Sequence, residues 1–273
     1  MLSRHSRSGH FPGLGFLTVS MLLFLYLPLV ILVAFSFNSN RTVSVWEGFT
    51  LNWYTVAAEN SDLLNAVLNS AIVATSSTFL SLCLAVPAAL ALTSGTLRKP
   101  ATNLVVGVLS LPLLIPEIVI AVALLLLFTL SGFNAGMFTL LLGHTLFTFP
   151  FALLPILARA AGLDRSLKEA GLDLYASPLK VFWFITLPLL LPGIVSGGML
   201  AFIVSFDNFI VSMMISSAGW TTLPLYIYGL VKTQITPEIN AISTVILIGS
   251  FLALTACFVL TGGKMAGVSG REN

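Results

Sequence analysis

Hydrophobic and charged positions divide this chain into long, almost uncharged blocks. Five blocks contain two charged residues at most, and they cover residues 14–40, 63–97, 100–163, 181–231 and 239–263. Roughly 20 apolar residues of helix cross a bilayer core about 30 Å thick, and the longest block divides at the segment 131–136, SGFNAG, which is typical of a tight turn. The pattern therefore predicts six transmembrane helices, at residues 14–36, 66–94, 102–130, 136–159, 185–212 and 239–262.

Composition agrees with this pattern. Hydrophobic residues make up 57% of the 273 positions and charged residues 8%, whereas soluble domains contain about 25% charged residues. An ordinary water-soluble globule is excluded, and an all-α membrane protein is expected. The first apolar run is longer than that of a secretory signal and no small-residue cleavage site follows it, which favours an uncleaved anchor. One transmembrane domain at 14–262 is predicted, with a loop at 163–184 and tails at 1–13 and 263–273.

The distribution of basic residues predicts the orientation. With the N-terminus in the cytoplasm and the loops assigned alternately, ten basic residues lie inside and two outside. The inner ones are Arg4, Arg7, Arg98, Lys99, Arg159, Arg165, Lys168, Lys180, Lys264 and Arg271, and the outer ones are Arg41 and Lys232. Because cytoplasmic loops carry an excess of Lys and Arg, both termini are expected in the cytoplasm.

Catalytic chemistry has no support in the sequence. The chain contains no H-E-x-x-H, no G-x-S-x-G and no G-x-x-x-x-G-K-[ST], and its histidines are His5, His10 and His144. We therefore expect no catalytic residue, no metal site, no cofactor and no ATP binding by this chain. The segment 193–198, GIVSGG, superficially resembles a reactive-serine loop, but small residues at this density predict close helix packing in lipid.

The charged segment before the fifth predicted helix is the most informative part of the chain. Residues 169–192 read EAGLDLYASPLKVFWFITLPLLLP, a charged amphipathic turn followed by a hydrophobic run. This segment resembles the EAA loop of ABC-importer permeases, whose pattern is E-A-A, three residues, G, nine residues, I-x-L-P. Glu169-Ala170-Gly171 stands for E-A-A, and Ile185-Thr186-Leu187-Pro188 closes the motif at the expected spacing.

The resemblance implies that this loop couples the chain to a cytoplasmic ATPase. The implied coupling residues are Glu169, Ala170, Gly171, Asp173, Tyr175, Ala176, Leu187 and Pro188. Glu169 would pair with an arginine of the ATPase. The apolar residues expected to fill its groove are Leu172, Ala176 and Phe182. Two positions depart from the pattern: Gly171 replaces the third alanine, and Tyr175 replaces the glycine. Because glycine tolerates a positive φ, the tyrosine predicts a helical or extended backbone there instead, and it could also fill a pocket on the partner.

Further segments resemble the spermidine/putrescine branch of these permeases. They are residues 111–118, LPLLIPEI; 205–209, SFDNF; 221–228, TTLPLYIY; and 236–241, TPEINA. That branch usually has two acidic residues where this chain has Asp207-Asn208. The resemblance covers the chain from the first predicted helix onward and implies a type I, MetI-like ABC-importer architecture. It also implies a second permease subunit, homologous or identical, a cytoplasmic ABC ATPase dimer, an extracytoplasmic solute-binding protein and a lipid bilayer, with no nucleic acid.

Glu117 and Asp207 are the acidic residues inside the predicted helices. A charge in hydrocarbon costs at least about 2.5–3.5 kcal/mol, so such residues normally face a bundle interior or a watery cavity. We expect both to line the path of a cationic solute, with Asn208, Phe206, Phe209 and Trp220 nearby; the aromatic rings would supply cation–π contacts. On straight helices Asp207 lies about 33 Å and Glu117 about 22 Å from the inner face, so the solute would meet Asp207 first. The alternatives are a helix cap for Asp207 and an interhelical hydrogen bond for Glu117.

These observations predict a permease subunit of a bacterial inner-membrane ABC importer that moves polyamines inward. A permease of the same family for an opine, a phosphonate or ferric iron is the nearest alternative. An ion-coupled secondary transporter is less favoured, because no paired inverted repeat is evident. A membrane enzyme or scaffold would show no dependence on an ATPase.

Overall fold

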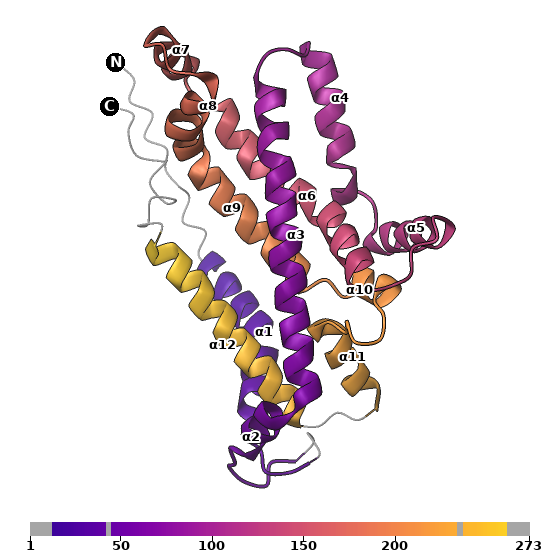
Figure 1. The fold of residues 1–273 in the computed structure, drawn as a ribbon. Helices are drawn as coiled ribbons and strands as arrows, with labels where there is room; N and C mark the ends of the chain where they lie inside the picture. Colours follow the sequence, from indigo (N-terminus) through magenta and orange to yellow (C-terminus); the bar gives the residue numbers. More distant parts are fainter. Residues whose placement is uncertain (1–12, 42–44, 234–236, 261–273) are drawn as a thin grey trace, which may run out of the picture. The chain divides into compact units, whose positions relative to one another are not determined.

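A computed structural model describes residues 13–41, 45–233 and 237–260, so the tails predicted at 1–13 and 263–273 lie almost entirely outside the described residues. The described residues are mainly helical, and an isolated β-bridge joins Asn38 to Phe49. The chain divides into two compact units: a terminal unit, Met1–Ser61 with Gly229–Asn273, and a central unit, Asp62–Tyr228. The prediction of an all-helical membrane protein is confirmed (Figure 1).

The terminal unit contains α1 (Leu14–Phe35), α2 (Asn52–Glu59) and α12 (Pro237–Leu260), and α12 packs against both other helices. The segment between α1 and α2 is organised around the buried side chain of Asn38. Its Nδ2 donates to the Val45 carbonyl oxygen at 2.7 Å, and its Oδ1 accepts from the Glu47 N–H at 3.0 Å. Because a buried amide is costly unless it is hydrogen-bonded, these contacts fix the segment.

The central unit is built from the remaining helices. They are α3 (Ser61–Thr93), α4 (Lys99–Leu109), the 3₁₀ turn Leu111–Leu113, α5 (Glu117–Leu130), α6 (Met137–Ala161), α7 (Arg165–Asp173), α8 (Pro178–Val181), the π-helical turn Phe182–Thr186, α9 (Leu187–Phe206), α10 (Ile210–Ile215) and the start of α11 (Leu223–Thr233). Among the described residues, four helices are long and apolar enough to cross a membrane: Gly15–Phe35, Ser61–Thr93, Met137–Ala161 and Pro178–Phe206. Glu117–Leu130 and Pro237–Leu252 are shorter apolar helices.

The third predicted span, 102–130, is not one continuous helix. It ends at Leu109, turns through the 3₁₀ segment and begins again at Glu117, so that α4 and α5 run in different directions (Figure 1). Pro112 and Pro116 explain the break: proline lacks a backbone N–H and disfavours helical geometry in the residue before it. Glu117 is therefore the first residue of a helix, and the straight-helix count of its depth was wrong.

The fifth predicted span, 185–212, is displaced along the chain. The helix runs from Pro178 to Phe206 and is interrupted before α10. It begins where Ser177 Oγ accepts the N–H of Lys180 at 3.4 Å, with proline at the first helical position. It ends beside Asn208, whose Oδ1 accepts the N–H of Val211 at 3.0 Å and so competes with continued helical bonding.

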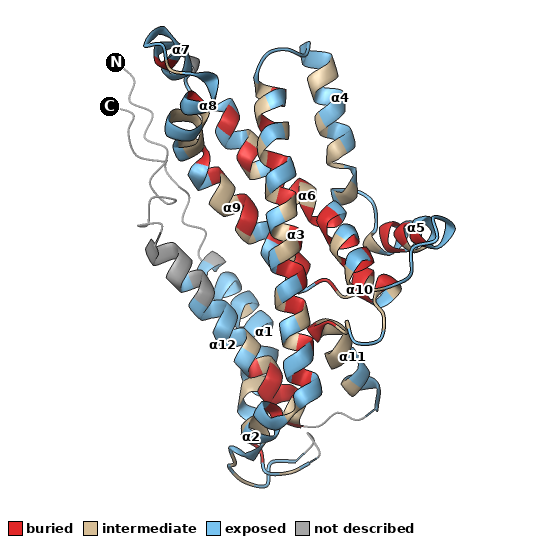
Figure 2. Ribbon diagram, in the orientation of Figure 1, coloured by how far each residue is buried: buried red, intermediate tan, exposed pale blue. Residues whose placement is uncertain are grey.

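Close approach of α6 and α9 forms the centre of the second unit. A Cβ atom at Gly197 would lie 2.5 Å from the carbonyl oxygen of Ala152, and one at Gly193 would lie 2.8 Å from Cβ of Arg159. Backbone cannot move aside as a flexible side chain can, so glycine is required at Gly197. Small residues four apart let helices pack tightly in lipid, which confirms the packing interpretation of residues 193–198. Figure 2 shows buried residues along both helices, whereas α1 is largely exposed.

Candidate functional site

The loop predicted to couple to an ATPase folds as two short helices, α7 and α8, at the end of the central unit where α3 leads into α4 (Figure 1). Its first helix starts at a side-chain cap, because Asp164 Oδ1 accepts the backbone N–H of Ser166 at 2.9 Å. That hydrogen bond lowers the pKa of the Asp164 carboxyl, since it stabilises the charged form. The connection between α3 and α4 and the predicted loop 163–184 thus lie at the same end of this unit (Figure 1).

Tyr175, in the turn that follows α7, has a conformation that the sequence pattern did not predict. Its φ is +58°, the one positive φ among the described non-glycine residues, so the expectation of a helical or extended backbone was wrong. The N–H of Tyr175 donates to the Leu172 carbonyl oxygen at 2.9 Å, and the N–H of Ala176 donates to the Gly171 carbonyl oxygen at 3.2 Å. This pair of bonds is a Schellman motif, which normally places glycine at the left-handed position. The loop therefore keeps the turn of the glycine-containing pattern while presenting a tyrosine.

Gly171 explains the other departure from the pattern. The residue is buried, and a Cβ there would lie 2.7 Å from Cδ1 of Ile185 and 3.2 Å from Cγ2 of Val181. The absence of a side chain lets α7 pack directly on α8 and the π-helical turn that follows it. An alanine would require these two side chains to move.

The exposed surface of the loop differs from the expected one. Glu169, Ala170, Asp173 and Pro188 are exposed, whereas Leu187 is half-buried. Of the residues expected to fill a partner groove, Leu172 is exposed, but Ala176 and Phe182 are half-buried. Within α7, α8 and the turn between them, the most exposed apolar side chains are instead Leu174, Tyr175 and Leu179, at 81%, 100% and 68%. We call these three residues the apolar tip; Leu174 and Tyr175 directly follow Asp173 in the sequence, and Leu179 lies in α8 after the turn.

Replacing Tyr175 by glycine is expected to stabilise the turn by about 1 kcal/mol, because an L-residue in the left-handed region is strained. The matched control is Tyr175→Ala, which removes the ring but keeps the strained Cβ. Hydrogen exchange at the amides of Tyr175 and Ala176 should slow about fivefold in the glycine variant and should not slow in the alanine variant. Equal slowing in both variants would contradict the strain.

Glu117, Asp207 and Asn208 come together in the central unit. Glu117 is the first residue of α5, and Asp207 and Asn208 occupy the break between α9 and α10. The packing of α5 against α10 brings the Glu117 carboxyl near the side chains of Asp207 and Asn208. Glu117 Oε1 and Asn208 Nδ2 are both buried and without a hydrogen-bond partner among the described residues. The expectation that a solute meets Asp207 well before Glu117 therefore gives way to a single cluster.

A buried polar network that the sequence pattern did not single out lies beside this cluster. His144 on α6 is 1% exposed; its Nδ1 lies 2.8 Å from Ser205 Oγ and its Nε2 3.1 Å from Ser212 Oγ. Ser205 Oγ also lies 2.9 Å from Ser77 Oγ on α3, and Ser212 Oγ donates to the Asn208 carbonyl oxygen at 2.8 Å. The network thus joins α3 and α6 to α9 and α10, the two helices that flank the break containing Asn208. A polar residue inside an apolar span was the available signal.

His144→Ala is expected to lower the free energy of unfolding by about 2–4 kcal/mol, because it removes a buried ring and one hydrogen-bond partner from each of the Ser205 and Ser212 hydroxyls. Thr129→Ala is the matched control: Thr129 is exposed, and its hydroxyl donates to the Leu125 carbonyl oxygen in its own helix. Denaturation of both variants in detergent measures the difference. Equal stability of His144→Ala and wild type would show that the network contributes nothing.

The aromatic residues expected on the path differ in their surroundings. Phe206 is half-buried and stacks on Phe202, with ring centroids 5.8 Å apart. Trp220 packs against the apolar cluster around Val73 and Phe147, so packing accounts for its position. Phe209 contacts the ring of Tyr228, at 4.7 Å between centroids. Of the three aromatic residues expected on the path, Phe206 lies nearest to Asp207 in the sequence.

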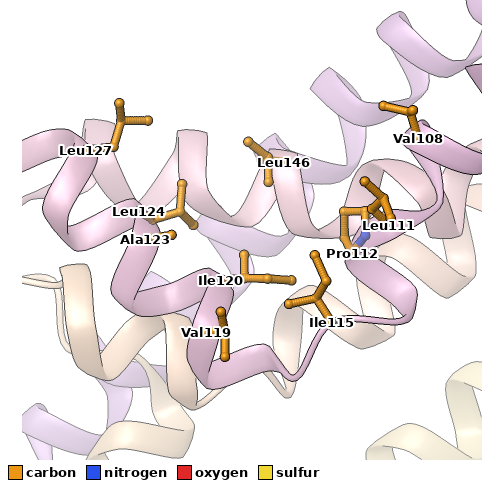
Figure 3. Close-up of a pocket in the computed structure, with 10 residues that line it drawn as sticks. All are labelled: Val108, Leu111, Pro112, Ile115, Val119, Ile120, Ala123, Leu124, Leu127 and Leu146. Carbon is orange, nitrogen blue, oxygen red and sulfur yellow. The ribbon is translucent and has the colours of Figure 1, made fainter.

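A separate cavity of about 370 Å³ lies where the α4–α5 turn meets α6 (Figure 3). Its lining is Val108, Leu111, Pro112, Ile115, Val119, Ile120, Ala123, Leu124, Leu127 and Leu146. No polar side chain is among these residues. An isolated charge is very unfavourable in such surroundings, so this cavity is unsuited to a cationic solute.

Comparisons with known proteins agree with this architecture. A chain in the crystal structure of a bacterial ABC transporter involved in the import of the acidic polysaccharide alginate has a similar fold, with a TM-score of 0.70 and 16% identity over 89% of this chain and 93% of that one. Residues 81–262 match the family described as binding-protein-dependent transport system inner membrane component. The fold is that of an ABC-importer permease.

Two curated relatives match over most of their length. The spermidine/putrescine transport system permease protein PotC of Escherichia coli (strain K12) is 35% identical over 257 residues, which are 94% of this chain and 96% of PotC. The putrescine transport system permease protein PotI of the same organism is 36% identical over 231 residues, 82% of each chain. This chain belongs to the family of binding-protein-dependent transport system inner membrane components. Membership implies a membrane location, an ATPase partner and a solute-binding protein.

Proposed function

We propose that this chain is the membrane-spanning subunit of an ATP-driven importer that moves polyamines such as spermidine and putrescine into the cell. The observation that supports this most strongly is the 35% identity to a spermidine/putrescine permease in an alignment that covers 94% of the chain. The cluster of Glu117, Asp207 and Asn208 suits that substrate class, because a polyamine is cationic and donates N–H bonds. Both termini would face the cytoplasm, as the basic residues predict.

The cluster would lower the barrier for an amine in two ways. The carboxylates of Glu117 and Asp207 compensate its positive charge, which is otherwise very costly in an apolar interior. The buried Glu117 Oε1, which has no partner among the described residues, accepts a hydrogen bond from the amine and so gains the partner it lacks. Binding in a transport path must also be weak enough for release. Asp207 is followed by the neutral Asn208 rather than by a second acidic residue, and a single negative charge at this place suits weak binding of a cation.

Coupling would run through α7 and α8. Their exposed surface combines the carboxylates of Glu169 and Asp173 with the apolar tip of Leu174, Tyr175 and Leu179. Two cytoplasmic ATPase subunits would bind this loop and the equivalent loop of a second permease subunit, homologous or identical. Because α7 packs on α8 through Gly171, the pair would move as one body when the ATPases close, and it would transmit that motion to α9. Gating motions of this kind are common in transport and catalysis.

Uptake of radiolabelled spermidine and putrescine by cells tests the proposal. Deletion of this chain should abolish ATP-dependent uptake at low external concentration, and expression of the wild-type chain should restore it. A panel with an opine, a phosphonate and ferric iron belongs in the same experiment, because Asp207-Asn208 has one acid where related polyamine permeases usually have two. Unchanged polyamine uptake after deletion, with loss of another solute, would contradict the substrate and retain the permease.

A further inference from the structure

A polar cleft of about 560 Å³ lies at the N-terminal end of α3, apart from the Glu117 cluster. Its lining residues are Asp62, Asn65, Ala66, Asn69, Gly219, Thr221 and Tyr226. α3 begins at Ser61 and ends at Thr93, so this cleft and the α7–α8 loop lie at opposite ends of the central unit (Figure 1). In the proposed orientation the cleft opens on the outer side of the membrane.

One wall of the cleft is a single face of α3. Asp62, Asn65 and Asn69 are separated by three and four residues, the spacing that places side chains on the same side of a helix. Seven residues of helix rise about 10 Å, so these side chains form a row of polar groups that extends inward from the start of the helix. Ala66, on the same face, leaves room between them.

The opposite wall is a fixed loop between α10 and α11. Asn69 Nδ2 donates to the carbonyl oxygens of Gly219 and Thr221, each at 3.1 Å. Ser70 Oγ accepts the N–H of Leu223 at 2.8 Å, which fixes the start of α11. Because both bonds of Asn69 use its nitrogen, its Oδ1 remains an acceptor. The cleft is therefore a built feature of the unit rather than a gap between loose segments.

The chemistry of the lining matches a cation with N–H donors. Asp62 supplies the one ionisable carboxylate among the lining residues, and the oxygens of Asn65 and Asn69 add neutral acceptors. Tyr226 adds an aromatic ring, which attracts ammonium groups when they lie over its face. No lysine or arginine lines the cleft. A carboxylate or phosphate solute would find no cationic side chain here.

We propose that this cleft is an outer binding site for aliphatic polyammonium ions, which occupy it after release from the solute-binding protein and before they reach Glu117. The inference rests on the proposed function. One ammonium group pairs with the Asp62 carboxylate, and a second, further along the aliphatic chain, reaches the oxygens near Asn69. A partly exposed ion pair contributes at most about 1 kcal/mol, so the site binds weakly and passes its solute on.

Labelled spermidine binding to the purified transporter in nanodiscs, without the solute-binding protein, tests this site. Asp62→Asn should weaken binding about threefold to fivefold, and Asp62→Glu should restore it. Asn65→Asp adds a second carboxylate to the same face and should tighten binding by a similar factor. Glu59→Gln, which removes an exposed carboxylate of α2 that does not line the cleft, should change nothing. Added salt should reduce the differences in spermidine affinity between the variants and the wild type, because screening weakens exposed charge pairs.

The outcomes separate the cleft from the proposed function. Unchanged binding in both Asp62→Asn and Asn65→Asp, in a transporter whose wild-type form imports spermidine, would overturn the outer site and leave the function intact. Absence of spermidine import by the wild type would overturn the function, and the outer site with it. Asp62 also lies in the first turn of α3, where a carboxylate stabilises a helix. If the role of Asp62 were purely structural, the Asp62→Asn variant would have a lower thermal stability, and the Asn65→Asp variant would show no gain in spermidine binding.

Discussion

A Glu169→Arg variant is expected to insert normally and to lose uptake by more than tenfold, together with the ATPase that co-purifies with the wild-type chain. Glu169 is exposed on α7, as are the residues of the apolar tip, Leu174, Tyr175 and Leu179. In the proposed complex its carboxylate faces an ATPase arginine, so reversal of its charge replaces an attraction by a repulsion. Like charges placed together at an interface cost several kcal/mol, enough to separate the subunits.

The measurement for this variant is the amount of ATPase retained on a tagged permease, read beside uptake. Glu59→Arg is the matched control, because it makes the same charge reversal at an exposed position of α2 in the terminal unit. It should keep the full amount of ATPase. Retention of the ATPase and of uptake by Glu169→Arg would show that coupling does not depend on this residue.

A Glu117→Gln variant is expected to lower polyamine uptake by at least about tenfold while leaving the ATPase bound. A tenfold loss corresponds to about 1.4 kcal/mol, less than the cost of an uncompensated charge in hydrocarbon. Glutamine keeps the shape of the side chain and a hydrogen-bonding oxygen but removes the charge that compensates the amine. The loss of uptake should therefore result from removal of the charge rather than from a change in packing.

Glu117→Asp provides the control for charge, because it retains the carboxylate on a shorter side chain. It should keep a larger share of uptake than the glutamine variant. Retention of the ATPase in both variants would show that each is folded and assembled. Normal uptake by Glu117→Gln at normal expression would remove Glu117 from the path.

The sequence predicted four of the six spans, the loop and the family, because each depends on local pattern. Long uncharged blocks predict membrane helices from length alone, and the ends of α1, α3, α6 and α12 lie close to the predicted ones. The loop could be located because its spacing is a property of neighbouring residues. The proline-containing break before Glu117 also had a local signal in Pro112 and Pro116, but the apolar run around it favoured a continuous span.

The remaining features depend on contacts between distant parts of the chain. The proximity of Glu117 to Asn208 requires the packing of α5 against α10. The bonds of His144 to Ser205 and Ser212 join residues 61 and 68 positions apart. Tyr175 shows the opposite case: its intrinsic preference disfavours a positive φ, yet the two Schellman hydrogen bonds and the packing of Gly171 hold the turn. Tertiary structure there overrides a sound local expectation.

Spermidine uptake into proteoliposomes that contain the transporter purified through a tag on this chain tests the central claim most directly. With the solute-binding protein outside and ATP available to the ATPase subunits, we expect uptake that stops when ATP is withheld and that does not respond to dissipation of ion gradients. Uptake that persists without ATP and collapses with an ion gradient would contradict the claim, because it would identify an ion-coupled secondary transporter instead.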